Sequence, residues 1–195
     1  MRQVPEDTRE VQGHRYKYAR IERERRFLLS ALPATPNAIR LRRIQDRYFI
    51  GTTLRLRKMS VLRDGGESHI YKLTQKISED HAVPGQRLTT NTYLSATEYE
   101  LLSQVPGSIL TKTRHSIPPM GLDVFDTPLD GLVLGEAEFE TDDAMSAFVP
   151  PSYVVAEVTH DVRFTGGQLV QTTREMLKAL LTVYGLSLVP GDPAG

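Results

Sequence analysis

The segment Glu22-Arg23-Glu24-Arg25-Arg26 alternates its side chains in a way that suits an extended strand. Successive side chains of a strand point to opposite faces, so Glu22, Glu24 and Arg26 share one face. The two carboxylates on that face are about 6.6–7 Å apart, with a cation beside them. The segment therefore predicts a strand with a charged face.

Other segments with strand-like alternation carry mostly one sign of charge. The basic ones are Leu54-Arg55-Leu56-Arg57, Lys72-Leu73-Thr74-Gln75-Lys76 and Lys112-Thr113-Arg114. Glu136-Ala137-Glu138-Phe139-Glu140 is acidic, and Glu157-Val158-Thr159-His160-Asp161-Val162-Arg163 is mostly acidic. A chain that gathers anions on some strands and cations on others is expected to hold a metal and a polyanion together.

The charged faces of these strands are predicted to line the inside of the fold. A strand taken alone usually turns its charged face to water. A solvated face intersperses the two signs, however, because like charges on neighbouring sites repel. Glu136, Glu138 and Glu140 form a triplet without a cation, and Arg55 and Arg57 form a pair without an anion. Burying such rows is costly unless a ligand neutralises them, so the inverted arrangement points to function.

The apolar residues between the charges are then expected to face outward, beneath covering helices. They are Leu54, Leu56, Ala137, Phe139, Val158 and Val162.

Composition limits the class of protein. A chain of 195 residues suffices for one domain with a sizeable core. Lys plus Arg and Asp plus Glu both number 24, whereas a nonspecific nucleic-acid binder shows a basic excess. The absence of cysteine excludes disulfides, thiolate zinc sites and a cysteine nucleophile. No apolar run approaches the roughly 18–20 residues of a membrane span, so a cytoplasmic protein without a membrane partner is expected.

The pattern of strands and turns predicts a mainly β (α+β) fold. Strands are expected at residues 19–28, 38–50, 52–60, 69–77, 87–94, 108–116, 120–126, 132–140 and 153–163. Turns are expected at Arg63 to Ser68 and at Pro84-Gly85. Eight or nine strands with short connections favour an antiparallel sheet that closes into an eight-stranded barrel with a charged lumen.

Three helices are expected to cover this sheet. Ser95 and Glu98 form a capping box for a helix that ends near Gln104. A short helix is expected from Thr141 to Phe148, and a C-terminal helix at 167–184. The predicted domain spans residues 19–186, between a polar lead-in at 1–18 and a tail at 187–195.

The order of these segments resembles a known family. Glu22-Arg23-Glu24-Arg25-Arg26-Phe27 resembles the Glu-x-Glu-x-Lys signature of the CYTH, or triphosphate tunnel metalloenzyme, superfamily. The further segments that resemble the family, in its order, are Asp46-Arg47-Tyr48-Phe49, the basic segments at 54–57, 71–76 and 112–114, Asp123-Val124-Phe125, Gly135-Glu136-Ala137-Glu138 and 157–163. The sequence departs from the family at Arg26, where the signature has lysine, and at Gly121, where many relatives have glutamate.

The resemblance implies an eight-stranded tunnel that binds a triphosphate with Mg²⁺ or Mn²⁺. Arginines suit forked contacts to phosphate oxygens, and lysines act as point charges. The expected substrate contacts are Arg26, Tyr48, Arg55, Arg57, Lys72, Lys76, Lys112, Arg114 and Arg163. The expected metal ligands are Glu22, Glu24, Glu136 and Glu138, followed by Asp123, Glu157 and Asp161. The expected catalytic set is Glu22, Glu24, Arg26, Glu136 and Glu138.

The first functional prediction is a metal-dependent triphosphatase that acts on inorganic tripolyphosphate or a small organic triphosphate. The alternatives are a class IV adenylate cyclase and a non-catalytic polyphosphate- or nucleotide-binding module. An RNA triphosphatase is less favoured, because the neutral chain shows no extra basic surface for RNA. No nucleic-acid partner is expected, and a homodimer is left open. Gly166-Gly167 is too short for a phosphate loop and is interpreted as a break before the last helix.

Overall fold

The computed structural model describes residues 17–34, 40–63, 66–77 and 85–188. The strands are β1 (Arg20–Leu29), β2 (Arg40–Phe49), β3 (Leu54–Arg63), β4 (Gly66–Ile77), β5 (Gln86–Leu94), β6 (Gly107–Ile117), β7 (Met120–Phe125), β8 (Val133–Phe139) and β9 (Ala156–Glu157). The helices are α2 (Ala96–Ser103), α3 (Asp142–Ala147), the 3₁₀ turn η1 (Val162–Phe164), α4 (Gly166–Leu169) and α5 (Arg174–Thr182).

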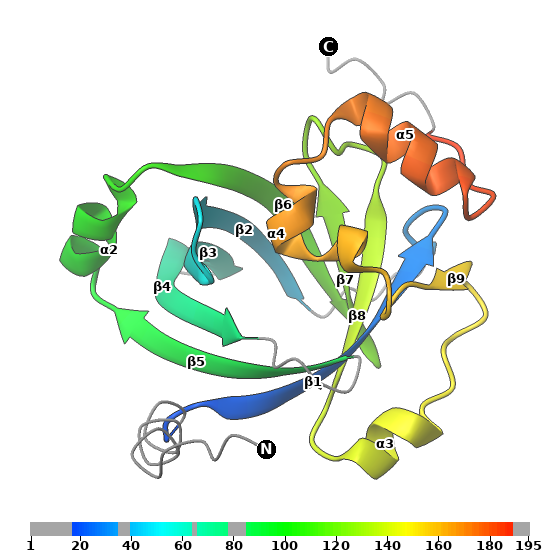
Figure 1. Cartoon of the computed structure of the whole chain (residues 1–195), viewed down its shortest axis with the longest axis horizontal. Helices are drawn as coiled ribbons and strands as arrows, with labels where there is room; N and C mark the ends of the chain where they lie inside the picture. The colour runs from blue at the N-terminus through cyan, green and yellow to red at the C-terminus, as the bar shows by residue number, and fades with distance from the viewer. Residues whose placement is uncertain (1–16, 35–39, 64–65, 78–84, 189–195) are drawn as a thin grey trace, which may run out of the picture.

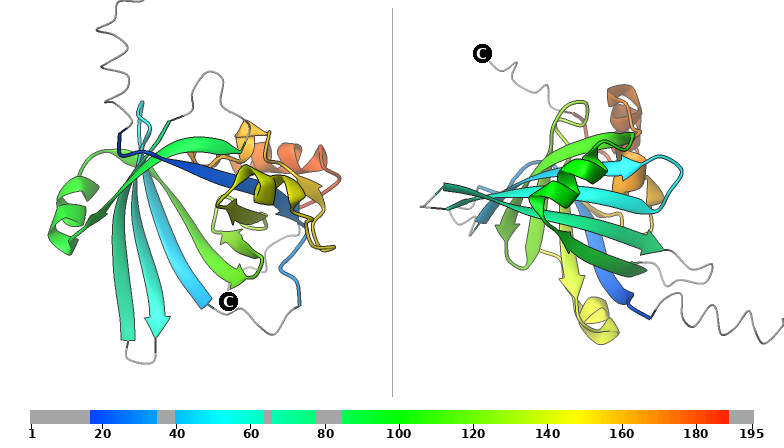
Figure 2. Two further views of the ribbon diagram at one scale, coloured as in Figure 1. Left: turned by 90° about the horizontal axis from the view of Figure 1, so that it is seen from below. Right: turned by 90° about the vertical axis from the view of Figure 1, so that its left-hand side faces the viewer.

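The strands β1 to β8 form a closed antiparallel barrel. Their order is β5-β4-β3-β2-β6-β7-β8-β1, and β1 also pairs with β5, which joins the two ends of the sheet. The short strand β9 adds to β1 (Figure 1). Figure 2 shows the barrel strands fanning around a common interior, with α2 at one side and α5 at the other. The predicted eight-stranded antiparallel barrel is confirmed.

The helices begin where the sequence predicts caps. The Ser95 side chain accepts a hydrogen bond from the backbone N–H of Glu98, and the Glu98 carboxylate accepts one from the backbone N–H of Ser95. Thr141 caps α3 through the backbone N–H of Ala144, and Thr173 caps α5 through that of Met176. These contacts satisfy backbone donors that the first helical turn leaves without partners.

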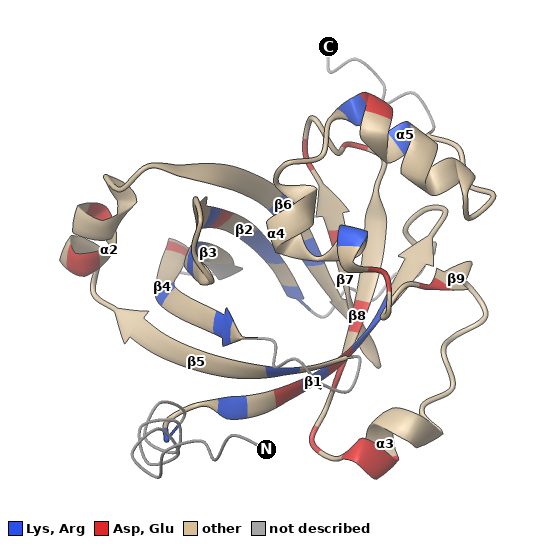
Figure 3. Ribbon diagram, in the orientation of Figure 1, with Lys and Arg blue, Asp and Glu red and all other residues tan. Residues whose placement is uncertain are grey.

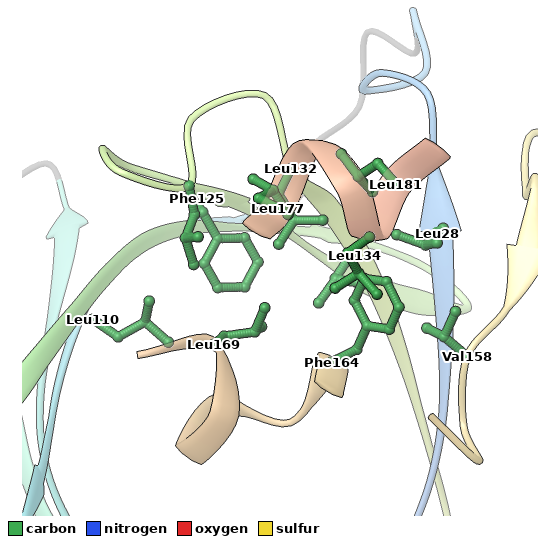
Figure 4. Packing of buried hydrophobic residues seen from close by; sticks show 12 residues of the cluster. Leu28, Leu110, Phe125, Leu132, Leu134, Val158, Phe164, Leu169, Leu177 and Leu181 are labelled. Atoms are coloured by element: carbon green, nitrogen blue, oxygen red, sulfur yellow. The ribbon is translucent and has the colours of Figure 1, made fainter. Parts of the chain in front are cut away.

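An apolar cluster closes one end of the barrel beneath α4 and α5. It combines lumen-facing side chains of the strands, such as Leu28 and Leu134, with Phe164, Leu169 and Leu177 from the C-terminal segment (Figure 4). A second cluster covers the outer face of β1, β7 and β8 and includes Phe27, Leu122 and Ala137. Ala137 and Phe139 of β8 thus face outward, as predicted. The prediction is wrong for Leu54, which lines the cavity of the barrel, and for Val158, which belongs to the cluster at the barrel end. Val162 is exposed and lies beneath no helix, because the strand ends before it.

The covering helices differ from the expectation. The helix α2 buries no residue, and its Tyr99 ring stacks on Tyr71 at 4.6 Å between centroids. The outer cluster is instead covered by partly buried residues of the segment around and after α3, including Phe148 and Tyr153. The helix α5 supplies the expected cover, with Leu177, Leu180 and Leu181 buried.

Two element predictions near the C-terminus are wrong. The strand expected at 153–163 is reduced to the two residues of β9, followed by the 3₁₀ turn η1. The backbone N–H of Phe164 bonds to the carbonyl of Asp161, which turns the chain away from the sheet. The helix expected at 167–184 is divided into α4 and α5, because Thr173 begins a second helix with its own cap.

Some expectations fall on residues that the structure does not describe. They are residues 64–65 of the turn at Arg63 to Ser68, Pro84 of the turn at Pro84-Gly85, most of the lead-in at 1–18 and most of the tail at 187–195. Within the described part of the chain, no helix is long and apolar enough to cross a membrane.

Candidate functional site

Charged side chains from the strands converge on one cavity of about 360 Å³ inside the barrel. Its basic lining residues are Arg26, Arg55, Arg57, Lys72, Lys76, Arg87, Lys112 and Arg114. Its acidic lining residues are Glu22, Glu24, Glu136 and Glu138. Figure 3 shows these charges along the barrel strands, with acidic and basic residues together on β1, acidic ones on β8, and basic ones on β2, β4 and β5. The excess of cations suits the cavity to a polyanion.

The register between β1 and β8 brings the two Glu-x-Glu rows together. Glu24 lies opposite Glu138, and Arg26 lies opposite Glu136. Directly opposite residues of an antiparallel pair have Cβ atoms about 4.5–5.5 Å apart. Carboxylates from two strands, which are more than 110 residues apart in the sequence, therefore share one wall of the cavity.

Lys76 on β4 contacts both carboxylates of β1. Its Nζ forms an ion pair with Glu22, and it lies 3.7 Å from Oε2 of Glu24. The Thr89 hydroxyl donates a second hydrogen bond to Glu22 at 3.0 Å. These contacts lower the pKa of Glu22, although burial acts against them. Lys76 thus offsets the repulsion between two carboxylates that the strand places on the same face.

Two buried aspartates support the cationic side chains from behind the cavity lining. Asp46, 1% exposed, accepts from Arg57 Nε at 2.6 Å and Nη2 at 2.7 Å. Asp123, 0% exposed, accepts from Arg114 Nε at 2.7 Å and pairs with Lys112. Forked arginine–carboxylate contacts fix the guanidinium planes, so these cations present a fixed geometry to a ligand.

The remaining hydrogen-bonding capacity of the cavity lies in its arginines and one lysine. The Nε donors of Arg26 and Arg55 are buried and lack a hydrogen-bond partner in the described structure. Arg26 uses its Nη2 to donate to the Thr159 carbonyl at 2.8 Å, and Arg55 uses its Nη2 to donate to the Thr74 hydroxyl at 3.2 Å. Buried donors normally have partners, so these two mark places where a ligand oxygen fits.

Lys72 and Arg87 also line the cavity. Neither forms an ion pair or side-chain hydrogen bond with another described residue. Burial, together with the charges of Arg57, Arg55 and Lys76, lowers the pKa of Lys72 to about 8, and Glu22 acts in the opposite sense. A bound anion would therefore stabilise the charged form of the Lys72 amine.

The carboxylates have different electrostatic environments. Burial raises the pKa of Glu24, and the neighbouring charges of Glu136 and Glu22 add to this effect. Arg114, which contacts Glu136, and Lys112 hold the pKa of Glu136 well below its usual range against burial. The ionised form is therefore disfavoured at Glu24 and favoured at Glu136, although the two carboxylates line the same cavity.

The structure brings most of the sequence-predicted site residues to this cavity. Tyr48 and the twelve charged residues named above all line it. Eleven of those twelve were predicted from the sequence, and Arg87 was not. Arg87 stands alone on a strand of otherwise uncharged residues, so no row of like charges marks it. Its register position opposite Glu22 is the signal that could have identified it.

Four predicted residues lie elsewhere. Asp123 lies behind the lining, where its carboxylate is saturated by cations. Glu157, which belongs to β9, forms a forked pair with Arg25 at 2.9 and 2.6 Å, on the opposite face of β1 from Glu24 and Arg26. Asp161 and Arg163 pair with each other at 2.6 Å in a separate shallow depression. The sequence prediction failed for Asp161 and Arg163 because the strand ends at Glu157.

The lining carboxylates offer the oxygen donors that Mg²⁺ and Mn²⁺ prefer. Among the described residues, no three acidic or histidine side chains are arranged to hold a metal by themselves. Mg²⁺ is commonly bound by one or two carboxylates together with substrate phosphates and water. The donor set is therefore compatible with a metal that arrives with its ligand, and Glu24 and the exposed Glu138 lie opposite each other on adjoining strands.

Comparisons with known proteins found partial similarities in sequence and in structure. No family model matches the chain. An inorganic triphosphatase of Nitrosomonas europaea is 39% identical over 77 residues, which are 36% of this chain and 51% of that protein. The chain thus spans about half the length of this curated relative.

Two solved structures resemble the chain over most of its length. A structure described as the inorganic triphosphatase NE1496 is 26% identical, covers 77% of this chain and 95% of its own, and gives a TM-score of 0.48. The PH1819 protein of Pyrococcus horikoshii is 17% identical, covers 86% of this chain and 92% of its own, and gives 0.41.

The closed antiparallel barrel and its charged interior define a tunnel-type domain. The signature on β1, the order of the charged strands and the partial similarity to the N. europaea protein resemble the pattern of the CYTH, or triphosphate tunnel metalloenzyme, superfamily.

Proposed function

We propose that the chain is a metal-dependent triphosphatase that hydrolyses inorganic tripolyphosphate or a small organic triphosphate. The observation that carries this proposal is the surplus of cations around one cavity, with the buried Nε donors of Arg26 and Arg55 left without partners. A triphosphate bears about four negative charges near neutral pH, and fixed cations stabilise it without reorganising during the reaction. The related N. europaea protein, named an inorganic triphosphatase, supports the same reaction class.

The cationic residues bind and orient the substrate in this proposal. Arg57 and Arg114 are held by buried aspartates, so their remaining N–H groups meet phosphate oxygens in a fixed direction. Lys72 and Arg87 lack anionic partners among the described residues and gain most from the substrate. Fixing the phosphates in this way lowers the entropic part of the activation free energy for the attack of water on the phosphate.

Divalent metal, Mg²⁺ or Mn²⁺, is part of the proposal. Glu22, Glu24, Glu136 and Glu138 would hold it, and Lys76 would give up part of its contact with the glutamates when it binds. A divalent metal held there would supply Lewis-acid polarisation of the phosphoryl group.

Arg26 has a binding role rather than a proton-transfer role. The attacking water forms the new P–O bond, and the anhydride P–O bond breaks with its electron pair going to the departing diphosphate, while the water proton passes to a phosphate oxygen or to solvent. Arginine stays protonated in proteins, so Arg26 cannot accept the proton of that water. Its unpartnered Nε can instead donate to a phosphate oxygen while Nη2 remains on Thr159.

A substrate panel tests the proposal. Tripolyphosphate, ATP and thiamine triphosphate are each supplied with Mg²⁺ or Mn²⁺, and phosphate, pyrophosphate and cyclic AMP are measured separately. We expect phosphate release, with tripolyphosphate preferred over ATP and a loss of turnover in a chelator. Cyclic AMP from ATP would establish the cyclase alternative instead. Binding of tripolyphosphate without turnover under either metal would establish a non-catalytic module.

The remaining expectations are part of the same proposal. A cytoplasmic location and a chain without nucleic-acid partners are expected for an enzyme that acts on a small soluble substrate. Sedimentation of the purified chain decides whether it forms a homodimer.

A further inference from the structure

The glycine pair Gly166-Gly167 begins α4 at the closed end of the cavity. The two glycines have very different surroundings. A Cβ added to Gly166 would lie 1.9 Å from the Tyr48 hydroxyl oxygen and 2.9 Å from its ring carbon Cζ. A Cβ added to Gly167 would meet no heavy atom within 4 Å. Only the first glycine is therefore required by its neighbours.

The requirement at Gly166 is steric and does not come from the backbone. Neither glycine adopts a positive φ, so an alanine could take either backbone conformation. Alanine also has a higher helix propensity than glycine, which would favour the substitution within α4. The close approach of α4 to Tyr48 is what excludes a side chain at 166.

Tyr48 connects α4 to the charged part of the cavity. Its ring packs against the apolar cluster beneath α4 and α5, and it lies opposite Arg55 in the β2–β3 register. Burial, with the charge of Asp46 added, raises the pKa of Tyr48 to about 12, so its hydroxyl stays a neutral group at physiological pH. Next to it, Arg55 Nε is buried without a hydrogen-bond partner, and the nearest carboxylate oxygen, on Asp46, is 3.6 Å away.

We propose that Gly166 is a positioning residue, whose missing side chain lets α4 pack on the Tyr48 hydroxyl and thereby holds Tyr48 beside Arg55 for a phosphate oxygen at the closed end of the cavity. The phosphate part of this inference rests on the proposed function. The positioning part rests on the packing alone. A side chain at 166 would move either α4 or the Tyr48 ring, and both movements change the space next to Arg55.

A double-mutant cycle with a matched control tests this inference. The variants are Gly166→Ala, Tyr48→Phe, the double variant, and Gly167→Ala as the control. Thermal unfolding reports the packing contact without any ligand. Calorimetric titration with tripolyphosphate in EDTA reports the consequence for anion binding by the cations alone.

We expect Gly166→Ala to lower the unfolding temperature and to weaken tripolyphosphate binding at least tenfold. Gly167→Ala should keep or raise the unfolding temperature and leave binding within about twofold. Tyr48→Phe removes the atom at 1.9 Å, so adding Gly166→Ala in that background should cost much less in both measurements.

Three outcomes would overturn the inference. Equal effects of the two alanine substitutions would show that the Tyr48 contact is unimportant. An undiminished effect of Gly166→Ala in the Tyr48→Phe background, including a double variant that fails to fold, would show that another contact is responsible. Coupling in unfolding with unchanged tripolyphosphate binding would leave only a structural role. Failure of the wild-type chain to bind tripolyphosphate would overturn the proposed function, while the unfolding cycle would still decide the contact.

Discussion

Glu24 and Glu138 face each other across β1 and β8. The Glu138 carboxylate has no hydrogen bond or ion pair with another described residue. Glu24 is 9% exposed, whereas Glu138 is exposed at the cavity edge. Two opposed carboxylates repel each other in a sheet. The proposed function accounts for this juxtaposition through a cation that would bind between the two carboxylates.

The first prediction follows from this pair. Glu24→Gln and Glu138→Gln keep the shape of the side chain and remove its charge, so each should lower metal-dependent turnover at least tenfold, about 1.4 kcal/mol. Turnover is measured over a range of metal concentrations. Glu140→Gln is the control, because Glu140 is exposed beyond the end of β8. Wild-type turnover by Glu24→Gln at limiting metal would contradict the assignment.

Arg26 gives a second prediction. Arg26→Lys keeps the positive charge but loses the fork that contacts Thr159, so we expect turnover within about tenfold of wild type. Arg26→Ala loses the charge-assisted contacts as well, which corresponds to about 1.5–3 kcal/mol per hydrogen bond, and the loss should fall mainly on KM. Steady-state kinetics with tripolyphosphate separate the two effects. Equal activity of wild type and Arg26→Ala would place this side chain outside the reaction.

The sequence predicted the barrel and most of the cavity lining because the side chains of a strand alternate between its two faces. The position of one residue therefore assigns its neighbours along the strand to the lumen or to the outside. Once Glu24 faces the lumen, Glu22 and Arg26 must do so too. The same rule failed after Glu157, because a 3₁₀ turn replaces the strand there. Asp161 and Arg163 therefore lie in a separate depression and not in the barrel cavity.

The register between strands could not be predicted from the sequence. The alternation on β7 correctly gave Asp123 an inward direction, but only the register shows that Lys112 and Arg114 take up its oxygens. Arg87 became part of the cavity only through its place opposite Glu22. The steric need for Gly166 likewise depends on a contact with Tyr48, which is more than 110 residues away.

Lys72 predicts a pH dependence of anion binding. Its pKa is lowered to about 8, so the free cavity loses this charge as the pH rises above 8, whereas a bound polyanion keeps the amine protonated. Binding above pH 8 should then take up one proton, and affinity should fall by up to about tenfold per pH unit. Calorimetry with tripolyphosphate in buffers of different ionisation enthalpy measures the uptake.

The control for this dependence is Lys72→Met, which should remove the proton uptake attributed to the amine. The comparison is needed because tripolyphosphate itself titrates in the alkaline range. Lys178→Met, an exposed substitution on α5, should retain the wild-type profile. Proton uptake that persists unchanged in Lys72→Met would assign it to the ligand or to another group.

The buried pair Asp46–Arg57 gives the last prediction. Arg57 and Arg55 hold the pKa of Asp46 well below its usual range despite burial, so its ionised form stabilises the fold above the unfolded-state pKa near 4, and that stabilisation is lost as the pH falls toward the folded-state value. Asp46→Asn leaves the buried Arg57 without a counter-charge, which should cost about 3–5 kcal/mol in urea unfolding at pH 7. Asp126→Asn, which breaks the more exposed pair with Arg43, should cost no more than about 1 kcal/mol. Equal losses in the two variants would show that Arg57 is stabilised without Asp46, and the cavity cations would then not depend on their buried aspartates.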